Sequence, residues 1–391
     1  MNEATMRKFS LFYFLTFFSF GALSPLLTVY LQENVGLTGS QIGIILSISP
    51  VVIIFIQPIW GMISDYTQKP KGILLITLLL TAIFGILYSF VGSFYSIVLM
   101  AFLLAVTQSA IVPISDSIAL NAVQKTKGDY GSVRLWGAIG FAVAVLIAGW
   151  LSDYFSLKVI FYTFSISLFL ALLVTARLPK ENQSVSVNIR DGMNRLVKIP
   201  KFMLFLVTTF LIFGPIFANN FYFGLYITEI GGTVAGVGIA FLFAAGSEAP
   251  FMKIAGRWIH RFGLMNIMIF AGSIGALRWF FYFLDPPLML VYVTTVVQGL
   301  SIGLFIPAAL QYVRDSTPVE VRATAVSLYS AVGNGLGSWF CTLLGGYIVE
   351  YYSVSYLYLF FGVLTVLGIV IVVVLKGMEN KGEKLLVGKE A

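Results

Sequence analysis

The feature that most constrains this chain is a series of apolar stretches, each close to 20 residues long. Twelve of them follow one another, separated by short polar segments: 9–32, 40–64, 73–92, 95–121, 131–152, 157–178, 202–227, 234–255, 264–284, 288–312, 322–348 and 354–375. A helix needs about 20 residues to cross roughly 30 Å of hydrocarbon, and it satisfies its own backbone hydrogen bonds there. The pattern predicts an all-α membrane protein with twelve transmembrane helices.

The composition supports this fold class. Of the 391 residues, 59% are hydrophobic and 10% are charged, whereas roughly 25% of the residues in an average soluble domain are charged. A water-soluble fold could not bury so much apolar surface. We therefore predict a multi-pass protein of the cell membrane that is surrounded by the lipid bilayer.

The positive charges are distributed unevenly between the two sides of the predicted membrane. If the N-terminus is cytoplasmic, about 20 of the 24 Lys and Arg lie on the cytoplasmic side, and only Lys158 lies outside. This bias orients helical membrane proteins, and it predicts that both termini are cytoplasmic. It also accounts for the net charge of +7 without a nucleic-acid partner, which we do not expect.

A short pattern recurs at the ends of four predicted helices and indicates internal symmetry. A glycine is followed four residues later by an acid at Gly61 and Asp65, Gly149 and Asp153, and Gly346 and Glu350, and by a histidine at Gly256 and His260. The glycines are 88 residues apart in the first half of the chain and 90 apart in the second. The pattern predicts inverted three-helix repeats within two pseudo-symmetric six-helix bundles, with a binding site between the bundles.

The predicted domains follow from these repeats. Residues 1–178 form an N-terminal six-helix bundle, and residues 201–375 form a C-terminal six-helix bundle. A polar and basic cytoplasmic linker, 179–200, joins them, and a charged cytoplasmic tail, 376–391, ends the chain.

Asp116 and Arg134 are the most informative charged residues, because they lie inside neighbouring predicted helices. The acid is about five residues inside the end of one helix and the base about four inside the start of the next, so they have matching depth. A charge in hydrocarbon costs roughly 2.5 to 3.5 kcal/mol on insertion scales, and such a residue marks a functional site by default. We predict that they meet at a buried polar site. The alternative is a structural salt bridge without a ligand.

A second pair, Glu248 and Arg278, lies near mid-depth on adjacent predicted helices of the second half. A buried carboxyl whose proton affinity changes between states can couple transport to protons. Glu248 with Arg278, together with Asp116, is the predicted proton-coupling set. Lys253 is a competing partner for Glu248, and a purely structural pair is the alternative.

Other polar and aromatic side chains inside the predicted helices are candidates for ligand binding. Amides offer hydrogen bonds and aromatic faces offer stacking: Gln108, Asn219, Asn220, Trp279 and Gln298. The sequence contains no phosphate loop, no metal-binding cluster and no nucleophile with a base. We therefore predict neither an enzyme nor ATP-driven transport, and we expect no cofactor or metal.

Between the second and third predicted helices, residues 61–71 read Gly-Met-Ile-Ser-Asp-Tyr-Thr-Gln-Lys-Pro-Lys. With twelve helices in two halves, this loop resembles that of the major facilitator superfamily. The match keeps Gly61, Asp65, Lys69 and Lys71, and it departs where Gln68 replaces the usual glycine. The resemblance implies a gating loop on the cytoplasmic side, in which the acid caps a helix and pairs with a base across the bundle.

Residues 130–141 read Tyr-Gly-Ser-Val-Arg-Leu-Trp-Gly-Ala-Ile-Gly-Phe. This segment resembles the fifth helix of the lactose permease and 3-phenylpropionate permease group of proton symporters. The resemblance implies that Asp116 and Arg134 bind the ligand and that Phe141 stacks on it. The aspartate is one methylene shorter than the glutamate of that group, and Phe141 replaces its tryptophan. The titratable pair in the tenth helix of lactose permease has no counterpart between Gln298 and Gln311.

These features predict a secondary active transporter that takes up a small solute with protons by alternating access. A sugar, a nucleoside or an aromatic carboxylate would suit the site. The alternatives are a multidrug or metabolite exporter of the same fold and a non-transporting membrane sensor. The partners expected are the small-molecule substrate, protons and lipid, with the chain as a monomer. The resemblance implies the bacterial cytoplasmic membrane.

Overall fold

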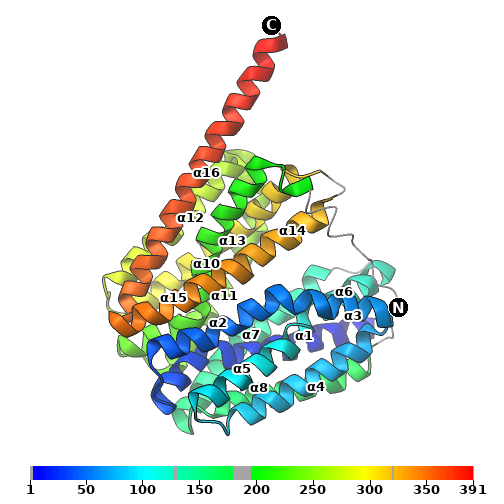
Figure 1. Cartoon of the computed structure of the whole chain (residues 1–391), viewed down its shortest axis with the longest axis vertical. Coiled ribbons are helices and arrows are strands. Elements are labelled where there is room, and N and C mark those ends of the chain that lie inside the picture. Colours follow the sequence, from blue (N-terminus) through cyan, green and yellow to red (C-terminus); the bar gives the residue numbers. More distant parts are fainter. Residues whose placement is uncertain (1–2, 127–129, 179–194, 319–320, 391) are drawn as a thin grey trace. The chain divides into compact units, whose positions relative to one another are not determined.

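The computed structural model describes residues 3–126, 130–178, 195–318 and 321–390. Its regular elements in these ranges are all helical (Figure 1). The first part of the chain contains α1 Glu3–Val29, the π-helix η1 Tyr30–Asn34, α2 Gly39–Phe55, α3 Gln57–Thr67, α4 Pro70–Tyr88, α5 Phe94–Gln108, α6 Ile111–Thr126, α7 Tyr130–Tyr154 and α8 Val159–Ala176. The second contains α10 Pro200–Glu229, α11 Val234–Phe262, α12 Leu264–Phe283, α13 Leu288–Asp315, α14 Arg322–Ser330, the π-helix η3 Ala331–Gly337, α15 Ser338–Tyr351 and α16 Val354–Glu390.

Among the described residues, eleven helical stretches are long and apolar enough to span a membrane, one fewer than predicted. The predicted helix 322–348 is not among these candidates, although the structure is helical there through α14, η3 and α15. The π-helical turn holds three buried glycines, Gly333, Gly335 and Gly337. Glycine weakens an α-helix, and π-turns form as local interruptions within helices. The all-α class is confirmed, and the orientation of the termini stays a prediction.

Two other predicted helices contain a local break near a proline, and each still qualifies as one membrane-spanning candidate. The stretch 40–64 becomes α2 and α3, which meet at Ile56 just before Pro58. The stretch 95–121 becomes α5 and α6, with a turn at 109–110 before Pro113. A proline lacks an N–H and its ring clashes with the carbonyl four residues earlier, which for Pro113 is that of Ser109.

The chain forms two compact units. The first comprises Met1–Ser186, Asn219–Ala245 and Thr342–Val354, and the second comprises Val187–Ala218, Gly246–Cys341 and Ser355–Ala391. The units follow packing and not chain order, because α10, α11 and α15 contribute to both. The predicted six-helix halves therefore stay a prediction, and each unit is described by itself.

In the first unit, α1 is the central helix and packs mainly against α7 and α8. The backbones of α1 and α7 approach very closely. A Cβ placed on Gly140 would lie 3.0 Å from the Cα of Phe14, so only glycine fits there. Small residues let membrane helices pack at such short range. This contact fixes the position of α7 along α1.

In the second unit, a buried apolar core joins α10, α12, α13 and α16. Phe205 of α10 and Tyr312 of α13 are its closest aromatic pair, with ring centroids 4.4 Å apart. The helix pair α12 and α13 packs side by side along much of its length. It positions the polar cluster described below.

Two copies of the repeated glycine pattern hold helix ends in the first unit. The Asp153 carboxylate accepts hydrogen bonds from the backbone N–H groups of Val234, at 3.2 Å, and Ala235, at 2.9 Å. The Glu350 carboxylate accepts one from the backbone N–H of Ser40 at 2.7 Å. The first N–H groups of a helix have no partner within the helix, and its N-terminus attracts negative charge. The two acids therefore cap α11 and α2.

The glycines of these two copies permit the close approach that the caps require. A Cβ on Gly149 would lie 2.5 Å from the Val234 carbonyl oxygen, and one on Gly346 would lie 2.6 Å from the Cα of Gly43. In the other two copies, a Cβ on Gly61 or Gly256 would meet no atom within 4 Å among the described residues. The repeated pattern thus has a tight packing role in only two of its four copies.

Candidate functional site

Tyr13, Phe17, Asp116 and Arg134 form a polar and aromatic cluster in the first unit, which we call the Arg134 cluster. The Tyr13 hydroxyl donates a hydrogen bond to the Asp116 carboxylate at 2.5 Å. Tyr13 lies on α1 and is fully buried, whereas Asp116 on α6 is half-buried. Hydrogen bonds to an ionised acceptor are roughly twice as strong as neutral ones. The tyrosine therefore holds the carboxylate in a fixed place.

The Arg134 guanidinium lies over an aromatic face. Its central carbon is 4.0 Å from the centroid of the Phe17 ring and 5.8 Å from that of Tyr13. Such cation–π contacts are worth about 0.5 to 2 kcal/mol, more when water is excluded. Gly137, one turn along α7, leaves room for this arrangement, because a Cβ there would lie 2.9 Å from the Phe17 ring.

The structure places the two predicted charges beside one tyrosine, but it does not join them directly. Among the described side chains, Asp116 accepts a hydrogen bond from Tyr13 and also interacts with Tyr130 of α7, and no ion pair links it to Arg134. The predicted acid and base share a neighbourhood, and the guanidinium N–H groups keep no carboxylate partner within the part of the chain that is described. They are thus able to bind a ligand.

Phe141 lies two helical turns beyond Arg134 on the same face of α7. Its backbone contacts the helix α1 at Gly21, and its ring lies 6.0 Å from that of Phe241. The ring is only half-buried. Its role in stacking on a ligand stays a prediction.

The three amides predicted for this region have different surroundings. Gln108 ends α5 and is half-buried, Asn219 on α10 is 2% exposed, and Asn220 is half-buried. Gln108 and Asp116 both lie within the predicted helix 95–121. A turn at 109–110 separates the two residues between α5 and α6, and the role of Gln108 stays a prediction.

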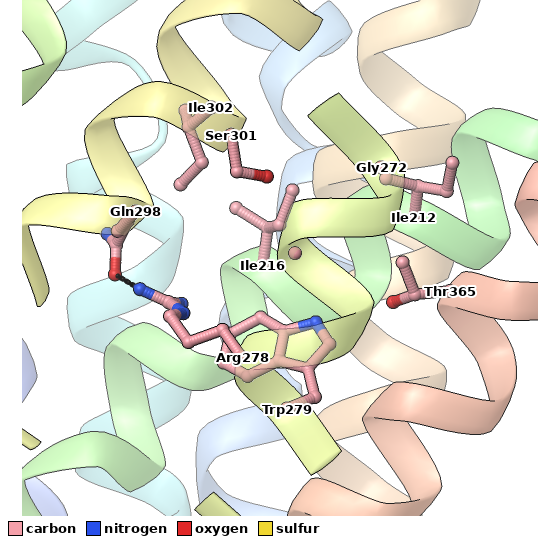
Figure 2. A pocket seen from close by; sticks show the side chains of 10 residues that line it. Ile212, Ile216, Gly272, Arg278, Trp279, Gln298, Ser301, Ile302 and Thr365 are labelled. Atoms are coloured by element: carbon pink, nitrogen blue, oxygen red, sulfur yellow. Dashed lines mark hydrogen bonds between the residues drawn. The ribbon is translucent and has the colours of Figure 1, made fainter. Parts of the chain in front are cut away.

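The second polar cluster lies in the second unit and consists of Glu248, Arg278, Trp279 and Gln298, which we call the Arg278 cluster. One terminal N–H of Arg278 donates to the Gln298 side-chain oxygen at 2.5 Å (Figure 2). The guanidinium carbon lies 4.3 Å from the centroid of the Trp279 ring. Arg278 is 6% exposed and Gln298 is 7% exposed. This arginine is buried, whereas Arg134 is half-buried.

Gln298 also interacts with the Glu248 carboxyl group, and Arg278 acts on that carboxyl electrostatically. Among the described residues no ion pair joins Glu248 to Arg278 directly, so the amide lies between the predicted partners. Lys253, the competing partner, is exposed on α11. The structure thus brings Glu248, Arg278 and Gln298 together.

The cavity beside Arg278 is small. Gly272, Gly275, Ser301 and Thr365 line it together with isoleucines of α10 and α13, and Figure 2 shows the guanidinium at its edge. Its volume is about 10 Å³, which is near the lower limit for one water molecule. Trp279 is 2% exposed and packs at 5.7 Å from the rings of both Tyr358 and Phe361. There is no room for a sugar at this point.

In the predicted gating loop, Lys71 contacts the end of α8. The Lys71 ammonium donates to the carbonyl oxygens of Ala176, at 2.9 Å, and Leu178, at 2.5 Å. A cation at the C-terminal end of a helix satisfies its last carbonyls and suits its dipole. Lys69 and Gly61 are exposed, and the side chain of Asp65 lies outside the described residues. The pairing of that acid across the bundle stays a prediction.

Sequence reasoning missed Tyr13 and Phe17. The sequence offered one sign of the contact between Tyr13 and Asp116, which is their equal depth in the membrane. Tyr13 is the fifth residue of the first apolar stretch, and Asp116 lies about five residues from the end of the fourth. In an aromatic-rich helix, however, a tyrosine is indistinguishable from a packing residue. No group of three or more His, Cys, Asp or Glu that could hold a metal occurs among the described residues.

Comparisons with known proteins agree with this picture. The family model described as the MFS_1 like family matches residues 6–360. The chain is 54% identical over 380 residues to the maltose permease of Geobacillus stearothermophilus, covering 96% of each chain. It is 25% identical over 355 residues to the probable 3-phenylpropionic acid transporter of Escherichia coli strain K12, covering 88% of this chain and 91% of that protein.

A solved structure has the same fold. The crystal structure of the nucleoside transporter NupG, as its D323A mutant, superposes with a TM-score of 0.86 at 18% sequence identity. The superposition covers 95% of this chain and 99% of that one. At this level of identity the likeness concerns the fold alone.

Proposed function

Because the chain belongs to the MFS_1 like family of secondary transporters, we propose that it is a proton-coupled permease that takes up maltose or a closely related sugar by alternating access. The observation that carries this proposal is the 54% identity to a maltose permease over 96% of both chains. The same relationship makes the chain a multi-pass membrane transporter and not an enzyme.

The Arg134 cluster offers what a sugar requires. Sugar hydroxyls both donate and accept hydrogen bonds, and the C–H faces of the ring pack on aromatic side chains. The Arg134 guanidinium supplies several N–H donors in a fixed plane. Asp116 supplies an acceptor that Tyr13 holds in place at 2.5 Å. We assign Arg134 and Asp116 to the sugar hydroxyls and Phe141 to the sugar ring.

The Arg278 cluster suits a proton better than a sugar. Its cavity of about 10 Å³ excludes any solute larger than water. A carboxyl that is buried beside an amide and a cation can bind or release a proton as its surroundings change. We assign this role to Glu248, with Gln298 and Arg278 holding the carboxyl in place.

Uptake into proteoliposomes tests the proposal. Labelled maltose, lactose, a nucleoside and phenylpropionate are each supplied with and without an imposed proton gradient. We expect a gradient to drive accumulation of maltose but not of the other solutes. Accumulation of maltose that ignores the gradient would remove proton coupling, and preference for another solute would remove the sugar assignment.

A matched pair of variants links the result to the site. Arg134→Ala removes the guanidinium of the cluster, whereas Arg177→Ala removes an exposed one beyond the end of α8. We expect maltose binding to be lost in the first variant and kept in the second. Equal binding in both would show that the Arg134 cluster is not the sugar site.

A further inference from the structure

A second, much larger hollow lies in the second unit, where α11 ends and α12 begins. Its volume is about 620 Å³, and we call it the α11–α12 groove. Its lining comes from these two helices and their junction: Ile254, Arg257, Trp258, Arg261, Phe262, Asn266, Ile267 and Phe270. It contains none of the residues assigned to the sugar or to the proton.

One end of the groove is basic. Arg257 and Arg261 are exposed and lie one turn apart on α11. Lys376 of α16 donates to the Asn266 side-chain oxygen at 2.6 Å, which brings a third cation to the rim. No acidic side chain occurs in the described lining. The groove is therefore complementary to an anion.

The sequence explains why this end of α11 is so basic. The groove lies at the fourth copy of the repeated pattern, where His260 replaces the acid found in the other three. In the first unit, acids of two copies accept hydrogen bonds from helix N-termini. Here Arg257 and Arg261 flank an exposed histidine instead.

The other end of the groove is apolar. Ile254 lies seven residues before Arg261, which is about 10 Å along a helix with a rise of 1.5 Å per residue. Ile267 and Phe270 extend the apolar wall along α12. Both helices are long and apolar enough to span a membrane. The groove therefore changes from charged to apolar in the direction that leads from the lipid headgroups to the hydrocarbon.

We propose that the α11–α12 groove binds an anionic phospholipid. Arg257 and Arg261 bind the phosphate, and an acyl chain lies along Ile254, Ile267 and Phe270. Basic pockets between membrane helices commonly hold acidic headgroups, and tryptophan favours the interface between headgroups and hydrocarbon. Trp258 lies between the two arginines in sequence and lines the groove. A free phosphate would use the basic end but leave the apolar wall without an occupant.

Native mass spectrometry of the purified full-length protein tests this site. Phosphatidylglycerol and phosphatidylcholine with identical acyl chains are titrated onto the wild type and onto the R257Q/R261Q variant. We expect the affinity for phosphatidylglycerol to fall about thirtyfold in the variant, since each basic residue near the surface contributes about fivefold. The affinity for phosphatidylcholine stays unchanged. Equal loss for both lipids would overturn the proposal.

Two further variants make the result specific. R257K/R261K keeps both charges and is expected to restore phosphatidylglycerol binding to within about fivefold of the wild type. R177Q/R195Q removes two exposed arginines outside the groove and is expected to bind the lipid normally. A loss of binding in R177Q/R195Q equal to that in R257Q/R261Q would mean that overall charge, and not the groove, attracts the lipid.

Fluorescence quenching tests whether an acyl chain lies along the apolar wall of the groove. Brominated phosphatidylglycerol quenches nearby tryptophan fluorescence, and the W258F variant identifies the share that comes from Trp258. We expect that share to be quenched in the wild type and not in R257Q/R261Q. Inorganic phosphate that displaces the brominated lipid at equal concentration would show that the groove is a simple anion site, and it would overturn the lipid assignment.

Discussion

Two arginines, one in each compact unit, lie over aromatic rings, but they differ in what surrounds their guanidinium groups. Arg134 is half-buried and lies 4.0 Å from the Phe17 ring, and its described surroundings include no carboxylate partner. Arg278 is 6% exposed and donates to Gln298 beside a cavity that holds at most one water. The Arg134 guanidinium therefore has N–H groups available for a ligand, whereas a terminal N–H of Arg278 is already bound to Gln298.

The bridging residue explains the difference. The Tyr13 hydroxyl donates to Asp116, whereas Arg134 contacts the ring faces of Tyr13 and Phe17 and not that hydroxyl, so acid and base meet different parts of the aromatic pair. An amide has both an acceptor oxygen and two N–H donors. Gln298 accepts from Arg278 with its oxygen and keeps its N–H groups for the Glu248 carboxyl. The amide therefore joins base and acid, whereas the tyrosine separates them.

The largest effect is expected for Arg134→Ala, which removes the group that we assign to sugar binding. Hydrogen bonds to a charged group contribute about 1.5 to 3 kcal/mol each, so the loss of two, about 3 to 6 kcal/mol, weakens maltose binding about 100-fold to 10,000-fold. Isothermal titration of the purified protein measures this. Arg134→Lys keeps the charge but not the planar fork of donors, and we expect it to restore less than a tenth of the lost affinity. Wild-type affinity in both variants would break the comparison.

Glu248→Gln tests whether the Arg278 cluster carries the proton. The amide cannot titrate, so we expect gradient-driven accumulation of maltose to fall more than tenfold. Exchange of labelled for unlabelled maltose needs no net proton movement, and we expect it to continue. Counterflow and gradient-driven uptake are measured on the same proteoliposomes. Undiminished accumulation would place the proton site elsewhere.

Tyr13→Phe is expected to act more mildly, because it keeps the ring below Arg134 and removes only the hydroxyl. The Asp116 carboxylate loses a hydrogen bond of 2.5 Å and becomes free to turn toward Arg134. A bond of this kind contributes about 1.5 kcal/mol or more, which corresponds to roughly tenfold weaker maltose binding. Tyr30→Phe, a change in a buried tyrosine of η1, is the control. Equal losses in the two variants would indicate a general effect on packing.

Much of the fold could be predicted from the sequence, because the bilayer leaves few choices. Apolar stretches of about 20 residues must become helices in hydrocarbon, and the structure has helices where the sequence predicts them. The departures are local. The helix breaks near Pro58 and Pro113 lie inside stretches that still qualify as single membrane-spanning candidates, and the glycines of η3 form a π-turn within the predicted helix 322–348.

The candidate site was predictable only in part. A charge inside an apolar stretch is conspicuous, so Asp116, Arg134, Glu248 and Arg278 could be found from the sequence alone. Tyr13 could not, because its hydroxyl acts through a contact 103 residues away along the chain. The packing between helices decides which residue lies between an acid and a base. The spacing of residues within one helix does not predict it.

The smallest effect on binding is expected for Trp279→Phe, and it sharpens the comparison. The sequence predicts Trp279 as a ligand residue, but its ring is 2% exposed and lies below Arg278 among other aromatic rings. Phenylalanine keeps a face for the guanidinium, so we expect less than a twofold change in maltose affinity and a loss of about 1 kcal/mol in the free energy of unfolding. Phe17→Leu, which removes the corresponding face below Arg134, should weaken binding about fivefold. If Trp279→Phe weakens binding more than Phe17→Leu does, the sugar contacts the second unit, and the division of roles between the two arginines is wrong.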